Sequence, residues 1–157
     1  MKSLHSFLTL ALYLAVAGCA LQQADSGTTA PAANGSAARN ELAARAGAPL
    51  FDGMGKHHHE ITTSDPDAQR YFDQGLVIDF AFNHAESARS FRAAQTLDPD
   101  CAMCYWGEAL ALGPNINVTS NGKVVMSDDD RAAAFSAIQK AVALKDNVSE
   151  AERDYIE

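Results

Sequence analysis

The sequence lacks the features that would place it in several common classes of protein. No apolar run is long enough to form a transmembrane helix in a mature protein. The formal net charge is -8 and no stripe of basic residues is visible, which argues against DNA or RNA as a partner. No nucleophile elbow, phosphate-binding glycine loop or dinucleotide fingerprint is present, so we expect the chain not to be an enzyme.

The apolar segment nearest the N-terminus, Leu4 to Val16, follows Lys2 and is too short to span a bilayer. It is typical of a signal peptide. The small residues before Cys19 resemble the lipobox of bacterial lipoproteins, in which the cysteine is lipidated and becomes the mature N-terminus. This resemblance implies a signal peptide over residues 1–18, a lipid anchor on Cys19, and a protein held at the bacterial envelope and facing the periplasm or the exterior. The alternative is a plain signal peptide cleaved at Ala17, Gly18 or Ala20.

Residues 19–49 have little that could form a core. The stretch 20–48 contains no aromatic residue and is dominated by Ala, Gly, Ser, Thr and Pro. Such a composition cannot bury enough apolar area to offset the entropy lost on ordering. We therefore predict a disordered, flexible linker over 19–49 that tethers the rest of the chain, with a short helix over 39–45 as the alternative.

A pattern of bulky and small residues begins twice within residues 50–157, at positions 34 apart. The first occurrence is at Tyr71, Gly75 and Ile78, and the second is at Tyr105, Ala109 and Leu112. Between them, a second set comprises Ser87, Phe91, Ala94 and Pro99. Because small residues let helices approach closely and proline stops a helix, this period predicts helix hairpins that repeat along the chain.

The second set recurs 47 residues later rather than 34, at Ala134, Ile138 and Ala141. The difference of 13 residues (47 minus 34) predicts an insertion over residues 113–127, with a hairpin turn at Asn121-Gly122. Insertions in repeat proteins cluster on one face, which is often the binding face.

The helix boundaries follow from capping residues. We predict a first helix that begins at Asp65-Pro66 and ends before a turn at Asn83-His84, and a second over 85–97. The third runs over 101–112, with Asp100 as its cap. A fourth follows a solvated acidic cap at Asp128-Asp129-Asp130, and a capping box, Ser149 with Glu152, opens a fifth.

This spacing resembles that of the tetratricopeptide repeat (TPR) family. Several short segments resemble segments in a group of secreted bacterial TPR proteins of poorly defined role. Among them are FNHAE at 82–86, DPDCAM at 98–103, WG at 106–107 and GPNIN at 113–117. The resemblance implies an all-α fold over 50–157, with antiparallel hairpins stacked as a short α-solenoid. Two repeats and the start of a third are fewer than such stacks usually need. We therefore expect a longer protein of which this is the first part or, if the chain is complete, pairing with a second chain.

Repeat proteins of this kind bind other proteins, and five polar or aromatic residues are our candidates for the contact surface. They are Asn83, His84, Trp106, Asn115 and Asn117. Asn83 and Asn117 occupy the same turn position in successive repeats, although such residues are more often caps and turn formers. The leading hypothesis is a scaffold that binds a protein or peptide in the groove formed by the first helix of each hairpin, without a cofactor.

The second hypothesis is a metal-binding or redox protein that holds zinc or copper. Its candidate ligands are His57, His58, His59, His84, Cys101 and Cys104. At least three of these side chains would have to converge within about 5 Å. The alternatives are a packed entry loop for the histidines and, for the cysteines, small core residues with or without a disulfide. A third hypothesis is the non-catalytic N-terminal part of a larger enzyme.

Overall fold

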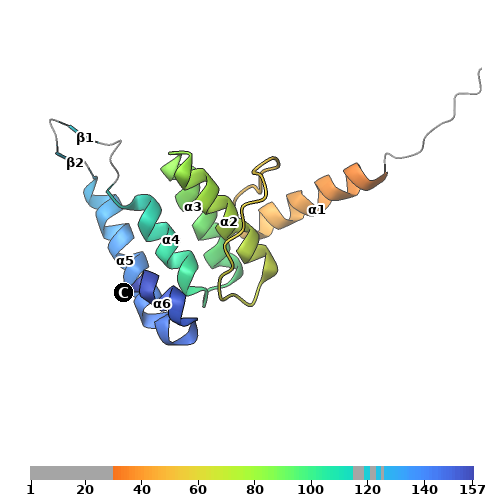
Figure 1. Cartoon of the computed structure of the whole chain (residues 1–157). Coiled ribbons are helices and arrows are strands. Elements are labelled where there is room, and N and C mark those ends of the chain that lie inside the picture. The colour runs from red at the N-terminus through yellow and green to blue at the C-terminus, as the bar shows by residue number, and fades with distance from the viewer. Residues whose placement is uncertain (1–29, 115–118, 121–122, 125) are drawn as a thin grey trace, which may run out of the picture.

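The computed structural model describes residues 30–114, 119–120, 123–124 and 126–157, and within these ranges the fold is all-α apart from one small ribbon. The helices are α1 (Ala30–Ala46), α2 (Pro66–Phe80), α3 (His84–Leu97), α4 (Ala102–Leu112), α5 (Asp128–Leu144) and α6 (Glu150–Ile156), with a 3-10 turn η1 (Lys145–Asn147) (Figure 1). The ribbon pairs β1 (Thr119–Ser120) with β2 (Lys123–Val124) in antiparallel register. The all-α prediction is therefore confirmed.

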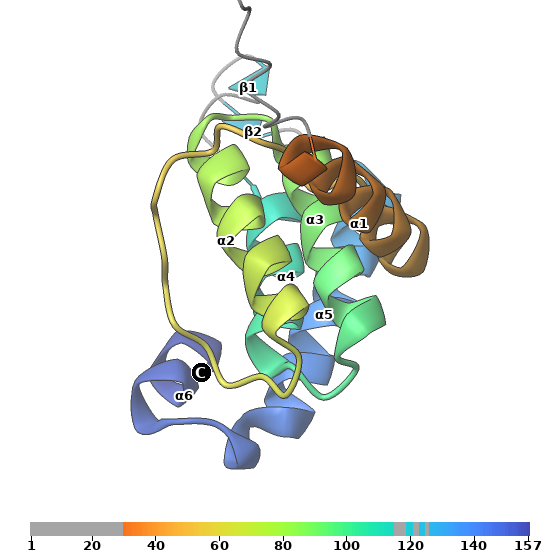
Figure 2. The ribbon, with the colours of Figure 1, turned by 90° about the vertical axis from the view of Figure 1, so that its right-hand side faces the viewer.

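Helices α2 to α5 pack in series, each against the next along the chain, and α6 returns to pack on α4 and α5. Figure 2 shows α2 and α3 side by side, with α4 and α5 behind them. Among the described residues, no helix is both long enough and apolar enough to cross a bilayer. The predicted signal peptide, Cys19, Asn115, Asn117 and the Asn121-Gly122 turn lie outside the described residues.

Most helix ends follow the capping residues. Asp65 accepts a hydrogen bond from the Asp67 amide ahead of Pro66, and α3 ends at Leu97 just before Asp98-Pro99. Both halves of the capping box at Ser149 and Glu152 are formed. Two predicted caps are wrong. The acidic run Asp128-Asp129-Asp130 forms the first turn of α5, and Ser127 is its cap.

The cap of α4 is Cys101 rather than Asp100, and the Cys101 sulfur accepts a hydrogen bond from the Cys104 amide at 3.2 Å. The backbone amide of Asp100 donates instead to Asp98 Oδ1, in the turn that precedes the helix. The helix therefore begins one residue later than the sequence predicts.

The core is organised around Phe91 of α3, which is fully buried. A Cβ atom added at Gly75 of α2 would lie 2.7 Å from the Phe91 ring, and one added at Gly107 of α4 would lie 2.4 Å from it. Both distances are far below van der Waals contact, so each glycine is needed for its helix to reach this ring. Gly75 has the close-approach role that the sequence predicts. Gly107 is a contact that the 34-residue period did not reveal.

The other residues of the repeat pattern lie at graded depths. Tyr71, Ile78, Ala94 and Ala141 are buried. Tyr105, Ala109, Leu112, Ala134 and Ile138 are half-buried, and Pro99 is exposed. The first hairpin therefore contributes more to the core than the second, whose α5 leaves Phe135 65% exposed on its outer side.

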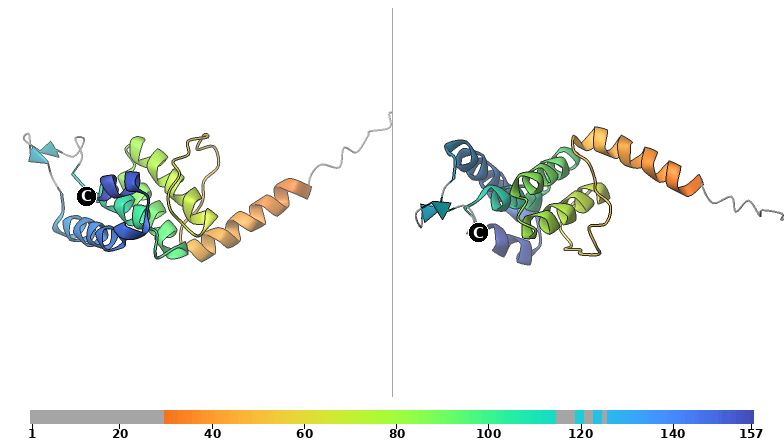
Figure 3. Two further views of the ribbon diagram at one scale, coloured as in Figure 1. Left: turned by 60° about the horizontal axis from the view of Figure 1, so that its bottom comes forward. Right: turned by 90° about the horizontal axis from the view of Figure 1, so that it is seen from above.

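The linker prediction for 19–49 is wrong over the residues of α1, which also exceeds the alternative helix over 39–45. Figure 3 shows α1 extending away from the other helices, with its C-terminal end against them. Leu42, Ala46 and Ala48 are buried there, and the Tyr71 hydroxyl donates to the Ala48 carbonyl at 2.6 Å. An alanine-rich segment forms a helix at little entropic cost once one end has a surface to pack on.

Residues 49–64, which we call the strap, connect α1 to α2 in extended form. Figure 2 shows the strap on the side of α2 away from α3, reaching α6 before it turns into α2. Its first part is tied to α2 by Gln74, whose side chain accepts from the Phe51 amide at 2.7 Å and donates to the Pro49 carbonyl at 3.1 Å. The strap therefore lies along the surface of the first helices.

Candidate functional site

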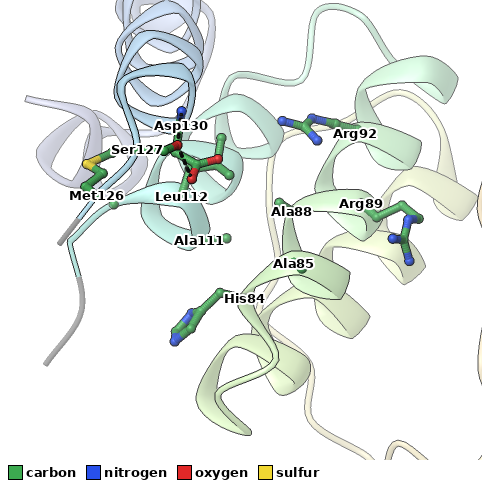
Figure 4. Close-up of a pocket in the computed structure, with 11 residues that line it drawn as sticks. His84, Ala85, Ala88, Arg89, Arg92, Ala111, Leu112, Met126, Ser127 and Asp130 are labelled. Carbon is green, nitrogen blue, oxygen red and sulfur yellow. Dashed lines mark hydrogen bonds between the residues drawn. The ribbon is translucent and has the colours of Figure 1, made fainter. Parts of the chain in front are cut away.

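An open groove runs between α3 and α5, with α4 as its floor. It contains two cavities, of about 550 Å³ and about 430 Å³. The larger lies between the N-terminal half of α3, the C-terminal end of α4 and the start of α5, as Figure 4 shows. The smaller lies further along α4, between the end of α3 and the middle of α5.

Small side chains create the depth of this groove. Ala88 and Ala111 are buried at the base of the larger cavity, and Ala137 is buried at the base of the smaller one. A methyl group fills little of the space between two helices, so the surface stays hollow. Leu112 and Met126 add larger apolar surface to the larger cavity. The base of the groove is therefore suited to apolar side chains.

The walls carry charge of both signs. Arg92 Nε lies 2.6 Å from Glu108 Oε1, and Gln95 Nε2 lies 2.7 Å from Glu108 Oε2. These bonds join the lining of the larger cavity, which includes Arg92, to that of the smaller, which includes Gln95 and Glu108. Lys140 stands 5.8 Å above the centre of the Tyr105 ring at the far end. The two cavities are therefore adjacent.

His84 lies at the edge of the larger cavity and is anchored by a buried carboxylate. Its Nδ1 is 2.8 Å from Oδ1 of Asp79, which is 8% exposed. Its Nε2 is buried and has no hydrogen-bond partner among the described residues.

Ser127 does not serve as a nucleophile in this arrangement. Its hydroxyl donates to Asp130 Oδ2 at 2.6 Å and accepts from the Asp130 amide at 3.0 Å, which is the geometry of a helix cap. The groove therefore offers apolar surface and hydrogen-bonding groups to a ligand.

Of the three predicted contact residues that the structure describes, it brings only His84 to this groove. Asn83 is exposed and caps α3, where its side chain accepts from the Glu86 amide. Trp106 lies on a different surface, with its ring 5.5 Å from that of Tyr155 on α6. The structure therefore does not bring Trp106 together with His84 at this groove.

The predicted binding groove along the first helix of each hairpin is not open. The strap covers it, and Thr62 in the strap donates to Glu152 of α6 through both its amide and its hydroxyl, at 2.6 Å each. His59 of the strap lies against Phe72 of α2 and Tyr155 of α6. A partner could reach this surface only by displacing residues of the chain itself.

The candidate metal ligands do not converge. Cys101 and Cys104 are joined by a disulfide and are fully buried. His58 Nδ1 is 2.8 Å from Asp73 Oδ2, and His84 is held by Asp79 on the other side of α2 from the strap. Within the part of the chain that the structure describes, no group of three or more His, Cys, Asp or Glu residues is arranged to hold a metal ion.

Sequence reasoning missed the residues that do line the groove. They include Arg89 and Arg92 of α3, together with the short residues Ala85 and Ala88. The available signal was the pairing of small residues, three apart, with arginines four residues later on the same helix face, at 85 and 88, then 89 and 92.

Comparison with models of protein families, with curated proteins and with solved structures finds no match to this chain. The resemblance to TPR proteins therefore rests on the spacing of residues in the sequence. The helical fold rests on the packing of α2 to α6.

Proposed function

We propose that this chain is a TPR-type scaffold that binds another polypeptide, and that the partner docks in the groove between α3 and α5. The hairpins packed in series and the close approach of α2 and α4 to Phe91 support a repeat scaffold. The observation that carries the binding site is the contrast between two surfaces. The first-helix surface is covered by the strap, whereas the α3–α5 groove is open.

The lining of the groove indicates the chemistry of the partner. Its base is apolar, from Ala88 to Leu112, while Arg89 and Lys140 stand on its walls. An amphipathic segment suits such a surface because its apolar side chains enter the groove and its carboxylates meet Arg89 and Lys140. We therefore propose an amphipathic segment with acidic residues at its edges.

We further propose that the scaffold works at the cell envelope, anchored by lipid on Cys19. The sequence before Cys19 supports this placement. Expression in a bacterium fed with a radiolabelled fatty acid tests it. The wild-type chain should carry the label and sediment with membranes, and Cys19→Ser should do neither. Equal labelling of both chains would contradict the anchor.

The binding site is tested by filling the groove. Ala85→Arg and Ala133→Arg place a long side chain in the larger and smaller cavity, on residues that are not fully buried. Each tagged full chain is used to capture proteins from envelope extracts. The proposal expects one or more proteins captured by the wild-type chain to be lost with both variants.

The matched controls are Ala132→Arg and Ala143→Arg, which make the same change on exposed positions of α5 outside the groove. They should capture the same proteins as the wild-type chain. If the groove variants and the controls capture the same set in the same amounts, the α3–α5 groove is not the binding surface.

A further inference from the structure

The strap is held on the first helices through its backbone as much as through its side chains. Asp73 of α2 accepts from the His59 amide through Oδ1 at 3.0 Å. Gln69, one turn earlier, accepts from the Ile61 amide at 3.0 Å and donates to the His59 carbonyl at 2.9 Å. Two side chains of one helix therefore satisfy three successive polar groups of an extended chain.

A second helix continues this pattern. Glu152 of α6 accepts from the Thr62 amide and hydroxyl at 2.6 Å each, across 90 positions of sequence. Burial on its own would raise the pKa of Glu152, but the hydrogen bonds from Thr62 and Ser149 outweigh it and keep the pKa below its ordinary value. The carboxylate that receives the strap is therefore charged under neutral conditions.

Only one strap side chain in this stretch is deeply buried. Ile61 is 6% exposed and belongs to the hydrophobic core. The neighbouring residues on both sides, Glu60 and Thr62, are exposed. His59 is half-buried, with its ring centre 6.1 Å from that of Phe72 and 6.0 Å from that of Tyr155. The buried side chain of Ile61, the aromatic contacts of His59 and several backbone hydrogen bonds therefore help to hold this segment.

These contacts are those by which a groove recognises an extended peptide, with backbone hydrogen bonds for affinity and alternate side-chain pockets for specificity. We propose that the surface formed by α2 and α6 is a second peptide-binding site, and that strap residues 57–63 are its built-in occupant. This site is separate from the α3–α5 groove. An extended segment from another polypeptide binds there when the strap is released.

The contacts also define the chemistry of the external ligand. It presents free amides to Asp73 and Glu152, so proline is excluded at the positions that correspond to His59 and Thr62. It carries a β-branched aliphatic residue in the place of Ile61 and a hydroxyl residue directly after it. The carboxylates at the site disfavour an acidic ligand and favour one with histidine or another cation at the position of His58, which faces Asp73.

The test uses a fluorescein-labelled peptide of residues 56–64, KHHHEITTS, as the probe. Its binding to the full chain is measured by fluorescence anisotropy. In Ile61→Asp, a charge in place of the buried side chain expels the strap, while the residues of α2 and α6 that form the site are unchanged. We expect this variant to bind the probe at least about tenfold more tightly than the wild-type chain, whose site is already occupied.

Thr62→Pro serves as the second strap variant because it removes both bonds to Glu152 at an exposed position. It should also bind the probe, and adding Asp73→Asn to it should weaken that binding by about tenfold. A scrambled peptide of the same composition should bind neither variant. Circular dichroism identifies the variants that keep wild-type helix content.

Two results would overturn the proposal. One is a folded strap variant that does not bind the probe. The other is a wild-type chain that binds it as tightly as the variants do, since the peptide would then bind elsewhere. Hydrogen exchange on the wild-type chain is an independent check: the amides of Ile61 and Thr62 should exchange faster than those of Phe72 and Leu76 in α2, because the strap opens on its own.

Discussion

The ring of Phe91 lies where a side chain at Gly107 would begin, with 2.4 Å between the ring and the place of an added Cβ. Phe91 belongs to the first hairpin and Gly107 to α4, so this contact joins one hairpin to the next. Because the aromatic ring cannot be compressed, it sets how closely α4 packs on α3.

We expect Gly107→Ala to lower the free energy of unfolding by about 1 to 3 kcal/mol, because the added methyl group forces the Phe91 ring and the helices apart. Gly75→Ala should have a similar effect. The measurement is urea unfolding followed by the fluorescence of the single tryptophan, Trp106. The control is Gly35→Ala in α1, which meets no atom within 4 Å. A stable Gly107→Ala chain would contradict the packing described for Phe91.

The disulfide between Cys101 and Cys104 closes a short loop at the start of α4. Replacing both cysteines with serine should lower the free energy of unfolding by about 2 kcal/mol, as expected for the entropy of so short a loop. Thermal unfolding with and without a reducing agent measures the effect. The reductant should lower the melting temperature of the wild-type chain and leave that of the double variant unchanged. Equal sensitivity of the two chains would contradict a bond between these residues.

One of the contacts that hold the C-terminal end of α1 is the hydrogen bond from the Tyr71 hydroxyl to the carbonyl of Ala48, two residues after the helix. Burial raises the pKa of Tyr71, which keeps the hydroxyl protonated and able to donate. Tyr71→Phe leaves the carbonyl without this partner and should cost about 1 kcal/mol of stability. Limited proteolysis should also cut the segment around residue 47 sooner than in the wild-type chain.

The matched control for this prediction is Tyr105→Phe, whose hydroxyl donates to the exposed Pro99 carbonyl at 3.2 Å. Water can replace that bond, so its loss should change neither stability nor proteolysis measurably. Similar effects from both substitutions would show that α1 is not held by Tyr71.

The attachment of the strap should depend on pH in two directions. Glu152 has a pKa below its ordinary value of 4.5, so its bonds to Thr62 stabilise the fold above pH 4.5, and this stabilisation is lost as the pH falls through the lowered pKa. The hydrogen bond that His58 makes to the Asp73 carboxylate, together with the negative charge of Asp73, raises the pKa of His58 above 6.5. The contribution of His58 is therefore complete below pH 6.5 and is lost as the pH rises through the raised pKa.

Melting temperatures of the wild-type chain and Glu152→Gln between pH 3 and 9 measure the first of these effects. The difference between the chains should be largest above pH 4.5 and shrink in acid. For His58→Gln, the difference from the wild-type chain should be largest below pH 6.5 and shrink in alkali. A difference that does not vary with pH would contradict the assigned contacts.

Local signals in the sequence predicted helices α2 to α6 well but missed α1. The caps at Asp65 and Ser149 could be read because a cap depends on residues within one turn of the helix start. The cap at Cys101 could not, since Asp100 is an equally good local candidate and the packing around the buried disulfide decides between them. Gly107 was missed because its contact with Phe91 joins two repeats and does not follow the 34-residue period.

The two surfaces were harder to predict than the helices. The strap has no periodicity, and its partners on α2 and α6 are separated by about half of the chain, so only the folded structure reveals that Thr62 meets Glu152. The α3–α5 groove exists because the residues at its base have short side chains. Ala88 and Ala111 are read from sequence as ordinary core positions, although together they leave a hollow.

The most direct test of the proposed binding groove is photo-cross-linking from two positions of α5. Benzoylphenylalanine is placed at Ser136, which lines the groove, or at Phe135, which is 65% exposed and lines neither cavity. Irradiation in an envelope extract should give a specific cross-linked polypeptide from position 136 and none from position 135, and Ala85→Arg should abolish it. The same products from both positions, or products that survive Ala85→Arg, would contradict the account.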